Sequence, residues 1–219
     1  MVTTAALGAF DEIRPRLRGW LHAAIVPVAV PAAVLIAVRA PHHLRLAVGV
    51  YSVTTVLIFS VSAVYHRIAW PTRFRSWWQR ADHSTIFLFI VGSFTPVAMV
   101  SFNSTWSWLL LSLMWGSGIV GIAIIWLFGI RTIVGVLYIV LGWAGLFALA
   151  PFLAEAGVVA ALLLCTGGLC YTVGALASRF KRPNPWPAVF GYHEVFHAMT
   201  VIGAICQYAA VTIAVSRPV

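Results

Sequence analysis

The feature that most constrains this chain is a series of apolar runs, each about twenty residues long, that covers most of the sequence. A hydrocarbon core of about 30 Å takes about 20 residues of α-helix to cross, so these runs predict membrane-spanning helices. Lipid permits only helices or closed barrels, and the runs lack the two-residue alternation of barrel strands. The expected fold is therefore an all-α bundle. Seven spans are predicted, at 20–38, 46–66, 82–101, 106–127, 132–152, 157–178 and 188–214.

The composition agrees with lipid as the main solvent of this chain. Hydrophobic residues make up 62% of the sequence and charged residues only 9%, whereas soluble domains carry roughly a quarter charged residues. The connections between the predicted spans are short, so residues 1–219 are expected to form one membrane domain. The connection 67–80, RIAWPTRFRSWWQR, interleaves arginines with aromatic residues and is typical of a segment at the head-group level.

The distribution of basic residues predicts the orientation of the bundle. Of the 14 Lys and Arg residues, all but Arg39, Arg45 and Arg217 fall on the side of the N-terminus in the predicted topology. The positive-inside rule therefore places the N-terminus in the cytoplasm and the C-terminus outside. Because these residues stand in short clusters between apolar spans, we expect contacts with anionic lipid head groups at the cytoplasmic face, and no nucleic acid partner.

Polar side chains that are costly in lipid gather at the cytoplasmic ends of three predicted spans. The second span ends with Ser62 and His66, the third begins with Asp82, and the seventh begins with His193 and His197. Three separate segments thus place polar groups at one depth on one side. The histidines outside this group are His22 at the start of the first span, His83 beside Asp82, and His42 and His43 in an outer connection.

The spacing of these residues predicts a metal site. His193 and His197 are four residues apart, so both rings lie on one helix face, about 6 Å apart along the axis. Two such imidazoles can share a zinc ion at about 2.0–2.1 Å each, and His66 is the best placed third ligand. Three protein ligands and one water form a catalytic zinc site, beside which Asp82 is expected to act as general base.

Several of these residues also have a structural interpretation. Asp82 fits an N-cap or a first-turn acid, which the helix dipole favours. Ser62, one turn deeper than His66, fits a helix-packing residue. The convergence of three segments is what favours metal binding. His83 lies about 100° around the helix from Asp82 and is left out of the predicted ligand set.

Residues 193–197, HEVFH, also match the H-E-x-x-H motif of zinc metalloproteases, in which the glutamate is the general base. Such sites take a further ligand, generally from later in the chain, but after His197 the sequence offers only Cys206. A protease is therefore the minority interpretation. Glu194 stays a candidate general base, or an acid that contacts a zinc ligand and not the ion itself.

Three segments of the sequence resemble a known family. SAVYH (62–66), DHSTIFLFIVGSFTP (82–96) and GYHEVFH (191–197) are similar, in this order, to motifs of the hemolysin III family. That family is the bacterial branch of the progestin and adipoQ receptors (PAQR), which are more distantly related to alkaline ceramidases. The resemblance covers nearly the whole seven-span plan, and it implies a bacterial protein of the inner (cytoplasmic) membrane with its N-terminus inside.

The resemblance also implies roles for the polar residues. His66, His193 and His197 would be zinc ligands, Asp82 would hold the metal-bound water, and Ser62 would be a polar neighbour of the site. The eukaryotic relatives are linked to hydrolysis of lipid amides such as ceramide. The bacterial branch is named after a cytolytic activity, and a role in membrane-lipid or membrane-energetics homeostasis is proposed for it.

Three functions are compatible with these observations. The first is a zinc-dependent intramembrane hydrolase of a lipid amide or ester, in which a kink at Pro96 helps to open space for an acyl chain. The second is a non-enzymatic sensor or homeostasis protein, in which a fourth ligand from Asp82 or His83 closes the zinc site. The third, a pore-forming hemolysin, is least favoured because the polar cluster is confined to one side. Membrane lipid is the expected partner, and whether a protein partner exists is left open by the sequence.

Overall fold

The computed structural model describes residues 15–130 and 132–217. This part of the chain forms α-helices and two short 3-10 helices, η1 (His42–Leu44) and η2 (Ala144–Ala148), without any β-strand. Arg14 and Arg131, which enter the predicted charge distribution, lie outside the described residues. The predicted all-α fold is confirmed. The seven α-helices in the described ranges are α1 (Trp20–Arg39), α2 (Arg45–Arg67), α3 (Thr72–Ser101), α4 (Ser104–Phe128), α5 (Thr132–Trp143), α6 (Leu149–Phe180) and α7 (Tyr192–Val215).

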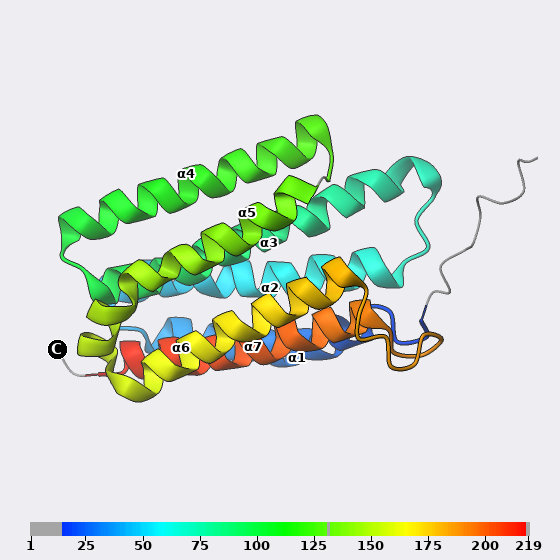
Figure 1. Cartoon of the computed structure of the whole chain (residues 1–219). Coiled ribbons are helices and arrows are strands. Elements are labelled where there is room, and N and C mark those ends of the chain that lie inside the picture. The colour runs from blue at the N-terminus through cyan, green and yellow to red at the C-terminus, as the bar shows by residue number, and fades with distance from the viewer. Residues whose placement is uncertain (1–14, 131, 218–219) are drawn as a thin grey trace, which may run out of the picture.

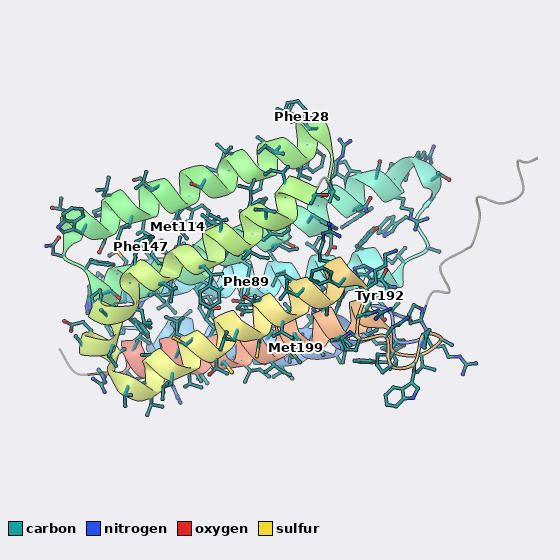
Figure 2. The ribbon with its side chains drawn as sticks, in the orientation of Figure 1. Phe89, Met114, Phe128, Phe147, Tyr192 and Met199 are labelled. Atoms are coloured by element: carbon teal, nitrogen blue, oxygen red, sulfur yellow. The ribbon has the colours of Figure 1, made fainter. Side chains whose placement is uncertain are left out.

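Within the described residues, six segments are long and apolar enough to cross a membrane. Five of them contain one α-helix each, and the sixth, Thr132–Phe180, contains α5, η2 and α6 in 49 residues. The outer surface of the bundle is apolar. Phe128 and Phe147, for example, are 61% and 81% exposed and project away from the helices (Figure 2). Lipid is the solvent that accepts such a surface, so the chain is a multi-pass membrane protein.

The long sixth segment folds back on itself. Figure 1 shows α5 and α6 side by side and running in opposite directions, with η2 and the first turns of α6 forming the bend. Gly157 leaves helical geometry there, with φ 83° and ψ 169°. That conformation is essentially restricted to glycine. The sequence predicts a break between residues 152 and 157, which agrees with this position.

The third helix starts earlier than the sequence predicts. Hydropathy places the start at residue 82, but α3 begins at Thr72, directly after Pro71. The arginine- and tryptophan-rich connection is therefore largely helical, and Trp78 stacks on Trp70 at a centroid distance of 4.5 Å. Asp82 lies almost three turns inside the helix. Its interpretation as an N-cap or first-turn acid is therefore wrong.

α3 lies at the centre of the bundle and contacts α2, α4, α5, α6 and α7. Among the helix pairs without α3, the most extensive contacts join α6 with α7 and α1 with α2. Half-buried indole groups bond across helices, since Nε1 of Trp126 donates to Ser84 and Nε1 of Trp143 donates to Thr172. Such bonds replace water, which is missing from lipid. The packing brings the start of α1, the end of α2 and the start of α7 to the same end of the bundle, opposite the C-terminus (Figure 1).

Candidate metal centre

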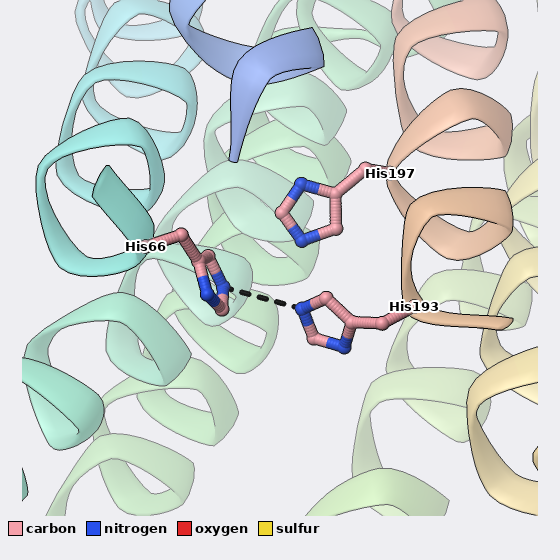
Figure 3. Close-up of side chains that lie close together, drawn as sticks. All are labelled: His66, His193 and His197. Carbon is pink, nitrogen blue, oxygen red and sulfur yellow. Dashed lines mark hydrogen bonds between the residues drawn. The ribbon is translucent and has the colours of Figure 1, made fainter. Parts of the chain in front are cut away.

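Three histidine side chains meet between the ends of α2 and α7. His66 lies in the last turn of α2, and His193 and His197 lie in the first two turns of α7 (Figure 3). Nε2 of His66 is 3.2 Å from Nε2 of His193, a residue 127 positions away in the chain. One ligand nitrogen of each of the three residues lies within 4.8 Å of the other two. The predicted convergence of the three histidines is confirmed.

Local backbone geometry explains why the rings face one another. α2 ends because Ile68 is extended, with φ −87° and ψ 137°. α7 begins after the extended Gly191, whose N–H donates to Oε2 of Glu194 at 2.9 Å, as in one half of a capping box. Gly19, with φ 77°, lets the chain before α1 approach closely, since a Cβ there would lie 2.6 Å from Cβ of His66.

The donor set fits a zinc ion. Imidazole nitrogens bind zinc at about 2.0–2.1 Å, so two ligands at a tetrahedral angle lie about 3.3 Å apart. The 3.2 Å between His66 and His193 is close to that value. His66 and His197 are 9% and 2% exposed, and His193 is half-buried, so bulk water has little access. Three protein ligands leave a fourth position open, as in catalytic zinc sites. The role of these residues as ligands stays a prediction.

Asp82 and Ser62 adjoin the histidines. Oδ2 of Asp82 is 3.7 Å from Nε2 of His66 and 3.7 Å from Nδ1 of His83. The Ser62 side chain lies beside the Asp82 carboxylate, on the neighbouring helix α2. His83 lies on the other side of Asp82, where its Nδ1 is also 3.0 Å from the Gln79 carbonyl oxygen. The carboxylate therefore stands between two imidazoles and one hydroxyl.

Glu194 is directed to other partners. Its Oε1 is 3.0 Å from Nε of Arg18, and its Oε2 accepts the Gly191 N–H. The residue is 1% exposed. A guanidinium and a helix N-terminus both stabilise a buried carboxylate. Glu194 therefore joins the chain just before α1 to the start of α7.

A cavity of about 470 Å³ adjoins the cluster. His66, Asp82 and His193 line it at the end of the bundle where α7 starts. Most of the remaining wall is apolar and comes from α3, α5, α6 and α7, including Phe89, Phe94, Ile139, Leu141, Leu149 and Leu164. A mainly apolar cavity with a few convergent polar groups is typical of a site for an amphiphilic ligand.

Sequence reasoning left His22 out of the polar group, but the structure places it against the cluster. Its ring stacks on that of His197, with centroids 3.9 Å apart and an interplanar angle of 31°. His22 also lines the same cavity. The first span begins at the depth where the second ends, so the depth argument that selected His66 could have included His22.

These features define a class of protein, a multi-pass helical membrane protein with a histidine and carboxylate cluster at one end of its bundle. The family model described as "Haemolysin-III related" matches residues 10–208, and the chain belongs to this family. It is 27% identical over 191 residues to Hemolysin-3 of Bacillus cereus, covering 84% of each chain. It is 25% identical over 164 residues to the Hemolysin-3 homolog of Bacillus subtilis (strain 168), covering 74% of each. The family expected from three short motifs is confirmed.

Proposed function

We propose that the protein is a zinc-dependent intramembrane hydrolase that cleaves an amide or ester bond of a membrane lipid similar to ceramide. His66, His193 and His197 would hold the ion. Zinc bound by three protein ligands makes water nucleophilic near neutral pH and polarises a carbonyl group. The observation that carries the proposal is the position of this donor set beside a carboxylate, Asp82, in the wall of a mainly apolar cavity.

We assign proton transfer to Asp82. Its Oδ2 lies 3.7 Å from Nε2 of His66, so the carboxylate faces the centre. From there it can accept a proton from the attacking water and return it to the leaving nitrogen or oxygen. The Ser62 hydroxyl beside the carboxylate is a candidate group to orient it. Glu194 is less suited to this role, because Arg18 and the Gly191 N–H occupy its two oxygens.

The apolar walls of the cavity support a lipid as the substrate. An acyl chain that moves from the bilayer to side chains such as Phe89, Phe94 and Leu141 stays in apolar surroundings. Specific binding energy then comes from the polar end of the molecule, where the histidines and Asp82 lie. This arrangement places the bond to be cleaved, and not the acyl chain, at the reactive groups.

We infer seven spans for this fold, with α5 and α6 each crossing the bilayer once. The N-terminus is then cytoplasmic, the C-terminus is outside, and the protein resides in the inner membrane. The arginines near the histidine end, including Arg67, Arg73 and Arg179, support this orientation because cytoplasmic ends carry excess positive charge. In that position they contact anionic lipid head groups.

One observation favours a second candidate, a non-enzymatic zinc protein that senses lipid state or maintains membrane homeostasis. Oδ2 of Asp82 is 3.7 Å from His66 and from His83. A small shift would bring this oxygen to the ion as a fourth protein ligand. A site with four protein ligands is closed and structural.

Metal content and lipid turnover, measured on the same purified protein, test the proposal. We expect the wild-type chain in detergent to contain zinc and to release fatty acid from a panel of ceramides and lipid esters. His193→Ala should lose both properties, and His42→Ala, in the exposed connection at the opposite end, should keep both. Tight zinc without turnover of any amide or ester would favour the second candidate. Zinc retained in the double variant His66→Ala, His193→Ala would contradict the ligand assignment.

A further inference from the structure

A polar amide lies deep in the cavity, far from the histidines. Gln207 of α7 is 7% exposed and lines the same cavity as His193. It follows His197 by ten residues in one helix, so the two residues are about 15 Å apart along the axis. The amide therefore lies well inside the hydrocarbon core, where a polar side chain is costly and calls for a functional explanation.

A tyrosine holds this amide in one orientation. The hydroxyl of Tyr171, on α6, donates to Oε1 of Gln207 at 3.1 Å. Gly203 makes room for the tyrosine ring, because a Cβ there would lie 2.6 Å from Cε1 of Tyr171. The ring of Phe89 meets the same tyrosine edge-on at a centroid distance of 5.8 Å. Since the hydroxyl has no other acceptor in the described part of the chain, the amide oxygen takes its proton, and Nε2 is left as the free end.

The Nε2 group of Gln207 has no acceptor among the described residues. Unlike the ring nitrogens of His22, it is not closed off by neighbouring atoms, so it is open to the cavity that the residue lines. A bond between α6 and α7 explains the amide oxygen, because such bonds hold helices together in lipid. It does not explain the two N–H donors on the nitrogen, which destabilise an apolar cavity unless a ligand accepts from them.

We propose that the cavity takes a lipid whose hydrocarbon chain carries an oxygen, as a hydroxyl or keto group, which accepts a hydrogen bond from Nε2 of Gln207. The mainly apolar walls accept the chain itself. With the polar end of the lipid at the histidines, the oxygen lies about 15 Å further along α7. Gln207 is then a specificity-determining residue, because a plain chain leaves its donors unpaired. The inference rests on the proposed function for the position of the polar end, and it names the chain of the substrate.

Competition binding to the purified protein in detergent tests this inference without any turnover. Three acids displace a fluorescent fatty acid: stearic acid, its derivative with a hydroxyl in the middle of the chain, and the isomer with the hydroxyl next to the carboxyl group. The wild type should bind the mid-chain isomer about 3–10-fold more tightly than the other two acids, the gain expected from one hydrogen bond. Equal affinity for all three acids would overturn the inference. Binding of none of them would overturn the lipid substrate as well.

Variants of the amide assign the preference to Gln207. Gln207→Leu has a similar size and no donor, so it should keep its affinity for stearic acid and lose the preference for the mid-chain hydroxyl. If it does not fold because the Tyr171 hydroxyl has lost its acceptor, the double variant Tyr171→Phe, Gln207→Leu removes both polar groups. Thr200→Val is the matched control, since Thr200 lines the same cavity but its hydroxyl already donates to the Phe196 carbonyl oxygen at 2.9 Å.

The outcomes separate this inference from the proposed hydrolysis. A preference for the mid-chain hydroxyl that survives in a folded variant without the Gln207 amide would overturn the role of Gln207. Loss of the preference in Thr200→Val as well would show that it does not depend on one amide. A wild-type chain that shows the preference but hydrolyses no lipid would overturn the hydrolase and leave the binding site in place.

Discussion

At the scale of single residues, two buried carboxylates lie close to the same histidines but differ in their surroundings. Both oxygens of Glu194 are engaged, one by the Arg18 guanidinium and one by the Gly191 N–H. Asp82 faces the cavity and stands 3.7 Å from His66. A general base needs a lone pair within reach of the reacting proton. Within the proposed function, these contacts favour Asp82 over Glu194 for the reactive role and leave Glu194 a structural one.

Asp82→Asn separates metal binding from proton transfer. The amide keeps the size and polarity of the side chain but cannot accept a proton in the reaction. We expect zinc content near that of the wild type and a turnover lower by about 10²–10⁴-fold. Zinc analysis and the rate of fatty acid release check this, with the exposed carboxylate variant Glu155→Gln as control. Unchanged turnover in Asp82→Asn would show that Asp82 is not the base.

The three histidines could be predicted from the sequence because helix periodicity and topology suffice to bring them together. His193 and His197 share a helix face, and His66 ends a span at the same side. The partners of Glu194 and His22 could not be predicted in this way. Arg18 and Glu194 meet only through the packing of the chain before α1 on α7, and the His22 ring meets His197 through the same packing.

At the scale of helices, the pair of Arg18 and Glu194 anchors the chain before α1 to the start of α7. Arg18→Ala and Glu194→Gln should each lower the free energy of unfolding by about 1.5–3 kcal/mol, since each leaves a charged group without its ion-pair partner. Unfolding in detergent, followed by circular dichroism, measures the effect. Arg16→Ala, which truncates an exposed side chain, is the control. The double variant should lose little more than either single variant, whereas additive losses would argue against coupling.

The contact between α6 and α7 depends on a glycine. A Cβ at Gly167 would lie 3.0 Å from the carbonyl oxygen of Gly203, whereas a Cβ at the adjacent Gly168 would meet nothing within 4 Å. Gly167→Leu should therefore lower the free energy of unfolding by about 1–3 kcal/mol through overpacking. Gly168→Leu should stay near the wild type. An equal free energy of unfolding in Gly167→Leu and Gly168→Leu would mean that α6 and α7 can move apart at this point at little cost.

Hydropathy predicted that α3 is a helix, but it did not predict where α3 starts. The turns from Thr72 to Asp82 carry arginines and tryptophans, so their mean hydropathy falls although the backbone stays helical. Helical hydrogen bonds do not require an apolar sequence, and an amphiphilic extension at the head-group level forms them equally well. Hydropathy therefore locates the part of α3 in lipid and misses the part beyond it.

At the scale of the whole molecule, the two ends of the bundle differ in charge and chemistry. The end with the histidines carries Arg67 and Arg179, and the opposite end carries few basic residues, including Arg39 and Arg45. The cavity begins at the histidine end and continues along α5 and α6. A lipid bound with its polar bond at the histidines would then have its head group on the positively charged side, which fixes the leaflet from which substrate is drawn.

The positive-inside rule predicts that the histidine end is cytoplasmic, and cysteine labelling in spheroplasts tests this orientation. With the native Cys165, Cys170 and Cys206 replaced by serine, single cysteines are placed at exposed positions of the connections. A membrane-impermeant maleimide should label His43→Cys and Glu155→Cys in intact spheroplasts, because both lie at the end opposite the histidines. Trp186→Cys, which is 68% exposed between α6 and α7, should react only after permeabilisation. The reverse pattern would invert the bundle and place the centre outside. Labelling of His43→Cys but not Glu155→Cys would mean that α5 and α6 do not each cross the bilayer.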